Sequence, residues 1–452
     1  MTALLGYASY VPRYRLSGAD IGLRRGDRVV ASFDEDSTTM AVQAAAGLPD
    51  TAPPRAVYFA TSSPAYADKT NATAIHAALG LPADAFATDF CGTGRSGFAA
   101  MKVAAASGGL AVTADVRVGR PGSADERFGG DGAAALLFGD GPGIAQVVAT
   151  SSSTEEFLDR WRSPMTSAGE QWEERFGAEH YARLIRATVE RVLDLADVSS
   201  VDHVVLTCPN TAVGKRAATL VKGEKSVATS PIGFAGAADA AITLCGVLDI
   251  AEPDETVLVI SAVDGCDAML LRTTGALADS RQPVTLRQQR EDGLPIPYLT
   301  YLSWRGLVEM QPPRRPEPDR PSGPATARGG HWKYALRGSR CDACGFTCLP
   351  PVRVCKRCGG LDAMSAVPVA ALRGVIATYT VDHLAYSPSP PVLQAVVDVD
   401  GGGRLTCEVA DADPAQLQIG ETVSFAFRRL FTAGGVHNYF WKVRLNGEPH
   451  GK

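Results

Sequence analysis

The chain has no uninterrupted apolar run near the roughly 20 residues that a membrane-spanning helix requires. It also has no excess of positive charge, because 44 Lys and Arg residues face 49 Asp and Glu residues, for a formal charge of −5. A general nucleic-acid-binding surface is therefore not expected. The start, MTALLGYASYVPRYRL, lacks the cationic lead, long apolar run and cleavage site of a secretory signal. We expect a cytoplasmic protein that binds neither membranes nor nucleic acid.

Cysteine is sparse, with ten residues among 452, and four of the ten are clustered. A reducing cytosol disfavours a disulfide framework. Clustered cysteines are therefore interpreted as metal ligands and an isolated cysteine as a candidate nucleophile. At roughly 100 to 200 residues per domain, the length predicts two to four domains.

Short apolar runs alternate with alanine- and glycine-rich stretches over the first 280 residues. The runs are mostly β-branched, as in strands buried on both faces: 56–60, 110–113, 203–207 and 256–261. The small-residue stretches 97–107 and 236–249 predict tightly packed helices. This alternation predicts an α/β fold.

Landmarks of this front part recur in the same order about 141 to 147 residues later. The strand end at Thr61 matches the one at Thr207. The glycine-rich turn at Gly92 matches the one at Gly233, and a third pair of strands follows at a similar offset. We interpret the repetition as an internal duplication, with a chance match of alternating βα units as the alternative.

A proline- and arginine-rich stretch, Gln311 to Arg328, follows the front part. It has no apolar period and predicts an extended linker. Five short strand-like runs near the C-terminus predict a small barrel, for which the OB-fold is one candidate: 374–381, 392–399, 404–409, 422–427 and 439–443.

Cys91 is the first candidate for chemistry, because it directly precedes a glycine-rich turn that opens a predicted helix. Such a turn lets backbone N–H groups approach a ligand closely. The positive end of the helix should favour the thiolate, which is the form that attacks carbonyl carbons. The same backbone donors can hold an oxyanion. A buried structural cysteine is the alternative interpretation.

The front part resembles the thiolase superfamily. Within it, the sequence is most similar to hydroxymethylglutaryl-CoA synthases of the archaeal and bacterial type and, more distantly, to ketoacyl synthase III. The F-C-x-x-G-x-x-G run at 90–97, the GDGAAALLFGD segment at 130–140 and the SAVDG turn at 261–265 carry the resemblance. It implies a layered α/β/α/β/α fold whose two halves are 1–150 and 151–280.

The resemblance also implies chemistry. Its members take an acyl group from an acyl-CoA onto the cysteine that matches Cys91, then form or cleave a carbon–carbon bond, and they generally form homodimers. The carried-over positions comprise four catalytic candidates and a lysine near the CoA phosphates: Ser62, Cys91, Thr207 and Asn210, and Lys215.

Several family groups are replaced in this chain. The synthases have a proton-transferring glutamate where this chain has Ser62, and an acceptor-polarising histidine where it has Thr207. An asparagine that normally follows the glycine of a second turn is also missing, because Phe234 follows Gly233. The general acid and base are therefore unidentified, with Glu126 as the nearest alternative carboxylate in sequence.

These observations predict a CoA-dependent acyltransferase or condensing enzyme that resembles hydroxymethylglutaryl-CoA synthase. Two alternatives stay open. One is retro-aldolase or thiolase-type cleavage of an acyl-CoA. The other is a non-catalytic acyl-CoA-binding scaffold for a partner thiolase, which the replaced groups motivate.

Two C-x-x-C pairs ten residues apart form the strongest local motif: Cys341, Cys344, Cys355 and Cys358. Two such pairs complete a tetrahedral site, which predicts structural zinc, with a redox dithiol or a metal-free ribbon as the alternative. The ribbon and the strands after it resemble the zinc-ribbon/OB-fold accessory domain that accompanies thiolase-like enzymes. We predict a linker at 281–330, a zinc ribbon at 331–365 and an OB-fold at 366–446, with a thiolase or other acyl-CoA enzyme as a candidate partner.

Overall fold

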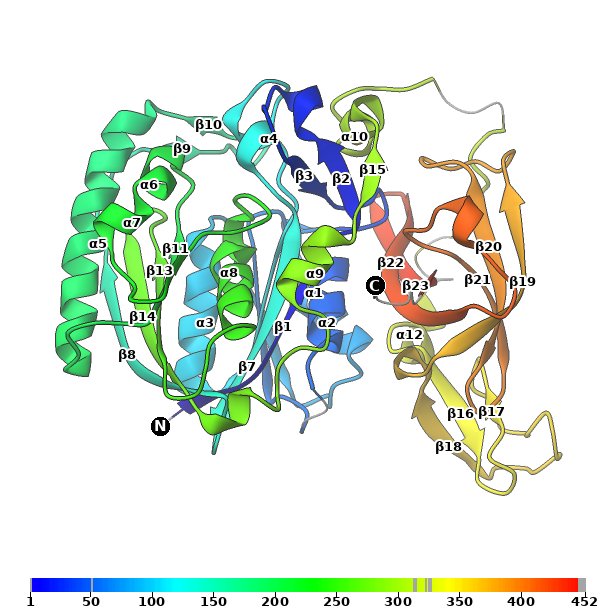
Figure 1. Ribbon diagram of the computed structural model, residues 1–452. Helices are drawn as coiled ribbons and strands as arrows, with labels where there is room; N and C mark the ends of the chain where they lie inside the picture. Colours follow the sequence, from blue (N-terminus) through cyan, green and yellow to red (C-terminus); the bar gives the residue numbers. More distant parts are fainter. Residues whose placement is uncertain (1, 50–51, 312–314, 322, 324–326, 446–452) are drawn as a thin grey trace. The chain divides into compact units, whose positions relative to one another are not determined.

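The computed structural model describes every residue except 1, 50–51, 312–314, 322, 324–326 and 446–452. The chain forms two compact units (Figure 1). The first unit comprises residues 1–31, 36–75 and 81–301, and the second comprises 32–35, 76–80 and 302–452.

The first unit contains two sets of five strands with the same topology. Across the sheet, the first set is β5 (Phe86–Cys91), β4 (Ala56–Thr61), β6 (Gly109–Asp115), β7 (Gly132–Asp140) and β1 (Thr2–Tyr10). The second set, in corresponding order, is β12 (Ser226–Ala228), β11 (His203–Thr207), β13 (Thr256–Ser261), β14 (Cys266–Thr273) and β8 (Ala145–Ser153). In each set the first three strands are parallel and the last two pairings are antiparallel. The predicted duplication is confirmed by this topology.

The two sets join through a short pairing of β1 with β8, and they enclose two central helices. These helices are α3 (Arg95–Ser107) and α8 (Asp239–Leu248), which follows the 3₁₀ turn η2 (Gly236–Ala238) (Figure 1). Outer helices cover the sheets, with α1 (Ser37–Ala46) on β6 and β7 and α5 (Glu174–Ala196) on β8 and β14. The unit therefore has the layered α/β/α/β/α arrangement that the resemblance implied.

Small residues let the two central helices approach closely. A Cβ added to Gly97 of α3 would lie 1.8 Å from the carbonyl oxygen of Ala237 in η2, so only glycine fits there. Both helices contribute to one apolar core, in which Phe98, Met101 and Leu244 are buried. The start of α3 and the turn before α8 are thus in direct contact.

The other elements of the chain up to residue 304 are short. They are β2 (Tyr14–Ser17), η1 (Gly18–Ile21), β3 (Asp27–Val30), α2 (Ala72–Ala78), α4 (Ala124–Phe128), β9 (Arg160–Trp161), β10 (Glu170–Gln171), α6 (Thr211–Lys215), α7 (Ala217–Leu220), η3 (Gly275–Leu277), α9 (Leu286–Glu291), β15 (Leu294–Ile296) and α10 (Tyr298–Trp304). Of these, α9, β15 and α10 fall inside the range 281–330 that the sequence predicts as a linker. The bounds of the five domains given above stay predictions.

The second unit contains two sheets. A three-stranded sheet has the order β17 (Thr347–Cys348), β16 (Arg337–Cys341) and β18 (Met364–Pro368). A five-stranded sheet has the order β21 (Arg404–Glu408), β20 (Val392–Val399), β19 (Gly374–Asp382), β22 (Thr422–Ala433) and β23 (Val436–Leu445). A bridge from Val409 to Val443 brings its two edges together, as in a small barrel. The five predicted strands are confirmed, and the last two are longer than predicted.

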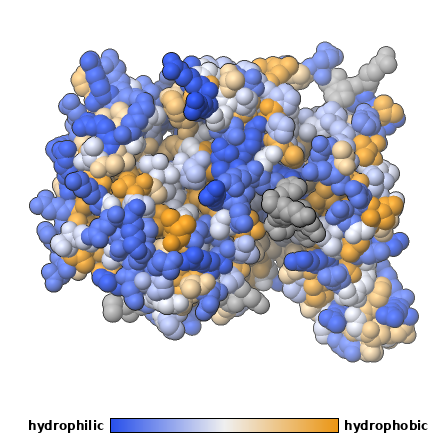
Figure 2. All heavy atoms as spheres, in the orientation of Figure 1, coloured by the Kyte–Doolittle hydropathy of each residue, from blue (hydrophilic) through white to orange (hydrophobic). Residues whose placement is uncertain are grey.

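Short helices accompany these sheets: α12 (Gly330–Lys333), η4 (Val369–Ala371) and η5 (Pro414–Gln416). Part of the predicted linker Gln311–Arg328 lies outside the described residues. Within the described part of the chain, none of the helices has the length and apolar character needed to cross a membrane. Figure 2 shows hydrophobic residues in scattered groups among hydrophilic ones on the face it presents.

Candidate active site and metal centre

Cys91 is the last residue of β5, where it pairs with Thr61 of β4. The chain turns at Gly92, whose φ of 120° is a conformation that favours glycine, and α3 begins at Arg95. The Thr93 hydroxyl donates to Asp264 Oδ2 at 2.6 Å, which holds this turn against the loop after β13. Cys91 thus precedes a central helix, as the sequence predicted, and it is exposed.

The predicted lowering of the thiol pKa is wrong. Partial desolvation of the sulfur and the nearby carboxylates of Asp89 and Asp115 raise the pKa of Cys91 to about 11. With its pKa raised in this way, the resting group at neutral pH is the thiol.

Asp115, at the end of β6, is a buried carboxylate that collects hydrogen bonds from both halves. Its oxygens accept from Thr61 Oγ1 and Ser62 N at 2.8 and 2.7 Å. They accept from the Ser62 and Ser63 hydroxyls at 2.8 and 2.9 Å. They also accept from Ala237 N, in the turn before α8, at 2.6 Å. Asp115 therefore ties the strand end that carries Ser62 to the second half.

Ser62 is buried and contacts two arginines. Arg117 Nη1 donates to the Ser62 hydroxyl at 3.0 Å, and Arg162 donates to the Ser62 carbonyl oxygen. The Arg117 guanidinium also lies over the Phe234 ring, 5.4 Å from its centroid. Ser62, predicted at the position of the family's glutamate, is thus a hydroxyl in a cationic setting, and it cannot act as a base at neutral pH.

Thr207 ends β11, and its hydroxyl donates to the carboxylate of Asp239, the first residue of α8. The other Asp239 oxygen accepts from Ala235 N at 2.8 Å. Burial raises the pKa of Asp239 to about 6, even though these hydrogen bonds and the Arg117 charge favour the carboxylate. Thr207, predicted at the position of the family histidine, therefore donates a hydrogen bond to an acid whose pKa is about 6.

A cavity of about 280 Å³ opens at this point of the second half. Its lining includes Leu206, Cys208, Ser230, Phe234 and Asp239. Phe234 also reaches the first half, because a Cβ added to Gly94 would lie 3.3 Å from its Cζ atom. Since Gly94 follows Cys91 by three residues, the cavity wall borders the start of α3.

The other predicted positions lie in different surroundings. Asn210 is the N-cap of α6, where its side chain accepts from Ala212 N and donates to the Glu174 carbonyl oxygen at 2.9 Å. Lys215 is the exposed last residue of α6. The Glu126 carboxylate accepts hydrogen bonds from Gly122 N and from the Tyr298 hydroxyl. Neither of these contacts includes Ser62.

Three functional candidates were missed by the sequence reasoning: Asp115, Arg117 and Asp239. Asp239 carried a usable signal, because it is an acidic residue inside an alanine-rich segment that predicts a buried helix. Arg117 and Asp115 carried none, since their contacts come from residues far away in sequence.

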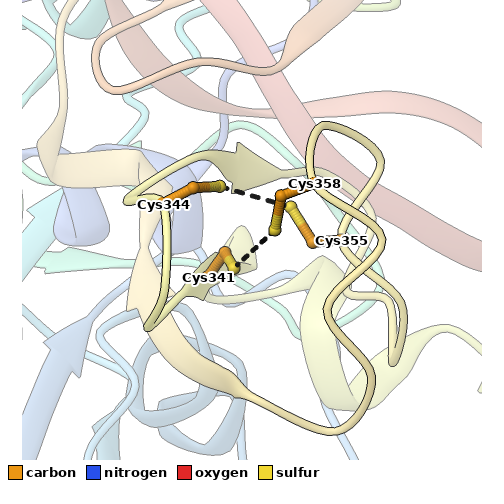
Figure 3. Close-up of side chains that lie close together, drawn as sticks. All are labelled: Cys341, Cys344, Cys355 and Cys358. Atoms are coloured by element: carbon orange, nitrogen blue, oxygen red, sulfur yellow. Dashed lines mark hydrogen bonds between the residues drawn. The ribbon is translucent and has the colours of Figure 1, made fainter.

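The four clustered cysteines come together in the second unit. Their sulfur atoms all lie within 4.8 Å of one another (Figure 3). The Cys341–Cys358 and Cys344–Cys355 sulfur pairs are each 3.6 Å apart. A tetrahedral metal with metal–sulfur bonds of about 2.3 Å requires sulfur–sulfur edges of about 3.8 Å, so these four residues fit a metal ion. Cys348 lies outside the cluster.

The chain is similar to curated proteins along its front part. It is 30% identical to the hydroxymethylglutaryl-CoA synthase of Archaeoglobus fulgidus in an alignment of 348 residues that covers 68% of this chain and 100% of that protein. The chain belongs to the hydroxymethylglutaryl-CoA synthase family. Its members are acyl-CoA-dependent condensing enzymes, which is the activity class that the resemblance implied.

Solved structures of similar proteins have the same fold as the front part of this chain. A hydroxymethylglutaryl-CoA synthase complexed with CoA has a TM-score of 0.60 and 16% identity, over 72% of this chain and 95% of that one. The 3-oxoacyl-(acyl carrier protein) synthase III of Pseudomonas aeruginosa PAO1 has a TM-score of 0.51 and 19% identity, over 60% of this chain and 98% of that one. Residues 366–428 match the family described as ChsH2, C-terminal OB-fold domain, which this synthase-family chain carries in addition.

Proposed function

We propose that this protein joins two acyl-CoA-derived units through an acyl thioester on Cys91. The observation that carries the proposal is the placement of an exposed Cys91 at the start of α3, in a chain of the hydroxymethylglutaryl-CoA synthase family. In the first step the Cys91 sulfur attacks the thioester carbonyl carbon of an acyl-CoA, the bond to the CoA sulfur breaks, and CoA leaves with the proton of the Cys91 thiol.

In the second step the acyl group on Cys91 loses a proton from its α-carbon, and this carbon forms a bond to the keto carbonyl carbon of a 3-oxoacyl-CoA acceptor, whose own thioester stays intact. The acceptor oxygen takes up a proton, and water then hydrolyses the Cys91 thioester. Backbone N–H groups after Gly92 are available to stabilise an oxyanion there. In this scheme the Ser62 hydroxyl, which donates to Asp115 and accepts from Arg117, fills the position of the family glutamate without transferring a proton.

The remaining predicted residues receive narrower roles. Thr207 is proposed to act together with Asp239, to which it donates a hydrogen bond. Asn210, as the cap of α6, is proposed to hold the loop after β11 in place. Lys215 is exposed and is proposed to contact the CoA phosphates, as the matching lysine does in related synthases.

Intact-mass spectrometry tests the thioester. Incubation with acetyl-CoA should add one acetyl group to the wild-type chain and none to Cys91→Ala. Cys208→Ala is the matched control, because Cys208 is half-buried and burial raises its pKa well above that of an ordinary thiol. An adduct that persists in Cys91→Ala, or the absence of an adduct with acetyl-, acetoacetyl- and propionyl-CoA, would contradict the proposal.

A non-catalytic scaffold is the second candidate, favoured by the hydroxyl groups of Ser62 and Thr207 in place of ionisable groups. It predicts CoA binding without an adduct or turnover, together with co-purification of an active thiolase from the native host. Cleavage of an acyl-CoA that persists in Cys91→Ala would instead indicate a retro-aldolase.

We also propose that the four-cysteine cluster binds one structural zinc ion. Four thiolates fill a tetrahedral site and leave no position for substrate, so the metal would cross-link β16 to the loop before β18. Metal analysis should give one zinc per chain for the wild type and for Cys348→Ser, and less than about a tenth of that for Cys355→Ser, which removes a ligand. Equal zinc in the two variants would contradict the assignment.

We further propose a homodimer that pairs through β5. This strand is at one edge of the ten-stranded sheet, and the side chain of Phe86 on it is 60% exposed. An exposed edge strand with an apolar side chain favours pairing with another strand. Light scattering should give twice the chain mass for the wild type and the chain mass for Phe86→Lys. A cytoplasmic location stays a prediction, which fractionation of the native host would test.

A further inference from the structure

The proposed reaction needs a group that removes a proton from an α-carbon and returns it to the acceptor oxygen. The family's glutamate and histidine are absent from their positions, so the described carboxylates are the candidates. Asp115 accepts hydrogen bonds from five donors and is already engaged on both oxygens. Glu126 is held by Gly122 N and the Tyr298 hydroxyl, and Asp27, which also lines the cavity, pairs with Arg290.

Asp239 differs from these three carboxylates. It lines the cavity and accepts hydrogen bonds from Thr207 Oγ1 and Ala235 N, and the Ser230 hydroxyl also faces it. An ionised carboxylate has about four acceptor sites, so these three donors leave it acceptor capacity. It also begins α8, whose preceding turn touches the start of α3, the helix that Cys91 precedes.

We propose that Asp239, oriented by Thr207, is the catalytic acid and base of this enzyme. The inference rests on the proposed thioester function. The Asp239 carboxylate takes a proton from the α-carbon of the acyl group on Cys91. The electron pair of that C–H bond forms the new bond to the acceptor carbonyl carbon, and the π pair of that carbonyl moves to its oxygen. The same carboxyl group then returns the proton to this oxygen, so that Asp239 ends unchanged.

The electrostatics of the pocket suit this role. A base works best when its pKa lies near the operating pH, and burial raises the pKa of Asp239 to about 6. The groups that face it are the hydroxyls of Thr207 and Ser230, the N–H of Ala235 and the charge of Arg117. Arg117 is the cation among them, and it holds the pKa below the value that burial alone would produce.

Deuterium exchange separates this role from acyl transfer. Full-length protein is incubated with acetyl-CoA in D₂O. Acetyl-Cys91 is measured by intact mass, and deuterium in the recovered acetyl-CoA is measured by mass spectrometry. We expect Asp239→Asn to form the adduct as the wild type does, and to incorporate deuterium about 100-fold more slowly. The amide oxygen of the substituted side chain would still accept from Ala235 N, so the fold should be kept.

Two further variants sharpen the test. Asp239→Glu should restore part of the exchange, because it keeps a carboxylate. Asp249→Asn is the matched control, since Asp249 is a buried acid with a raised pKa at the other end of α8, bonded to the Tyr7 hydroxyl and Leu286 N. It should exchange at the wild-type rate. The wild-type rate should rise with pH through about 6, and this inflection should be missing in Asp239→Asn.

Each result decides one question. Equal exchange by the wild type and Asp239→Asn would overturn the role of Asp239 while the thioester stands. An adduct without exchange in the wild type would do the same. Absence of both adduct and exchange in the wild type would overturn the proposed function, and this inference with it.

Discussion

The two halves of the first unit place different chemistry near the start of their corresponding central helices. In the first half, the chain leaves β5 through Gly92 and presents Cys91 before α3. In the second half, the turn η2 presents Asp239 at the start of α8. Strand order and direction are the same in both halves, yet the groups at the helix starts differ in kind.

The difference shows how surroundings set the state of each group. Partial desolvation of the Cys91 sulfur and the carboxylates of Asp89 and Asp115 raise its pKa and keep it protonated. Asp239 is buried, and its hydrogen bonds only partly offset the cost of burying a charge. One half therefore holds a weakly acidic thiol, which is the candidate nucleophile, while the other holds an acid that can exchange protons near neutral pH.

The largest effect on this comparison should come from the residue that links the halves. Asp115→Ala leaves the Ser62 and Ser63 hydroxyls and Ala237 N without their acceptor, and we expect a loss of about 3 kcal/mol of unfolding free energy. Asp239→Ala removes the acceptor of fewer groups, so its loss should be about 1–2 kcal/mol. Urea denaturation of both variants measures the difference in unfolding free energy. Equal losses would mean that the hydrogen bonds of Asp115 do not stabilise the contact between the two halves.

The second effect is on the reactivity of Cys91. A thiol with a pKa of about 11 has roughly a hundredfold less thiolate at pH 8 than a thiol with the ordinary value of 9. Because the raised pKa delays ionisation, alkylation by iodoacetamide should become faster with each pH unit up to about 11. Peptide mapping of Cys91 at several pH values, with glutathione as the reference thiol, measures this. An alkylation rate that levels off below pH 9 would show a lowered pKa for Cys91, as the sequence predicted.

The buried strands of this fold were predictable because their apolar runs are continuous. The predicted ranges 203–207 and 256–261 coincide with β11 and β13. Strand β5 was not predicted, because it is an edge strand and its sequence, FATDFC, mixes polar and apolar residues. Its absence from the prediction follows from the same exposure that makes it a candidate interface.

The site was only partly predictable, since a local motif shows a nucleophile but not its electrostatic surroundings. The glycine-rich turn identified Cys91. The charge of Asp115 acts on Cys91 from a different strand, and its partner Ala237 is 122 residues away in sequence. The pairing of Thr207 with Asp239 likewise joins a strand end to a helix start that are separated by 32 residues.

The smallest effect should come from Asn210, which is part of the second half but lies outside the contact between the central helices. Asn210→Ala removes the cap of α6, and we expect it to cost about 1 kcal/mol of unfolding free energy. Asn210→Asp keeps an oxygen that can accept from Ala212 N, so it should retain most of that stability. Acetylation of Cys91 should stay within about threefold of the wild type in both variants, because the nucleophile is held by the first half. A tenfold slower acetylation in Asn210→Asp, with stability intact, would show that the Asn210 amide acts on the thioester, and that the second half contributes to both steps of the reaction.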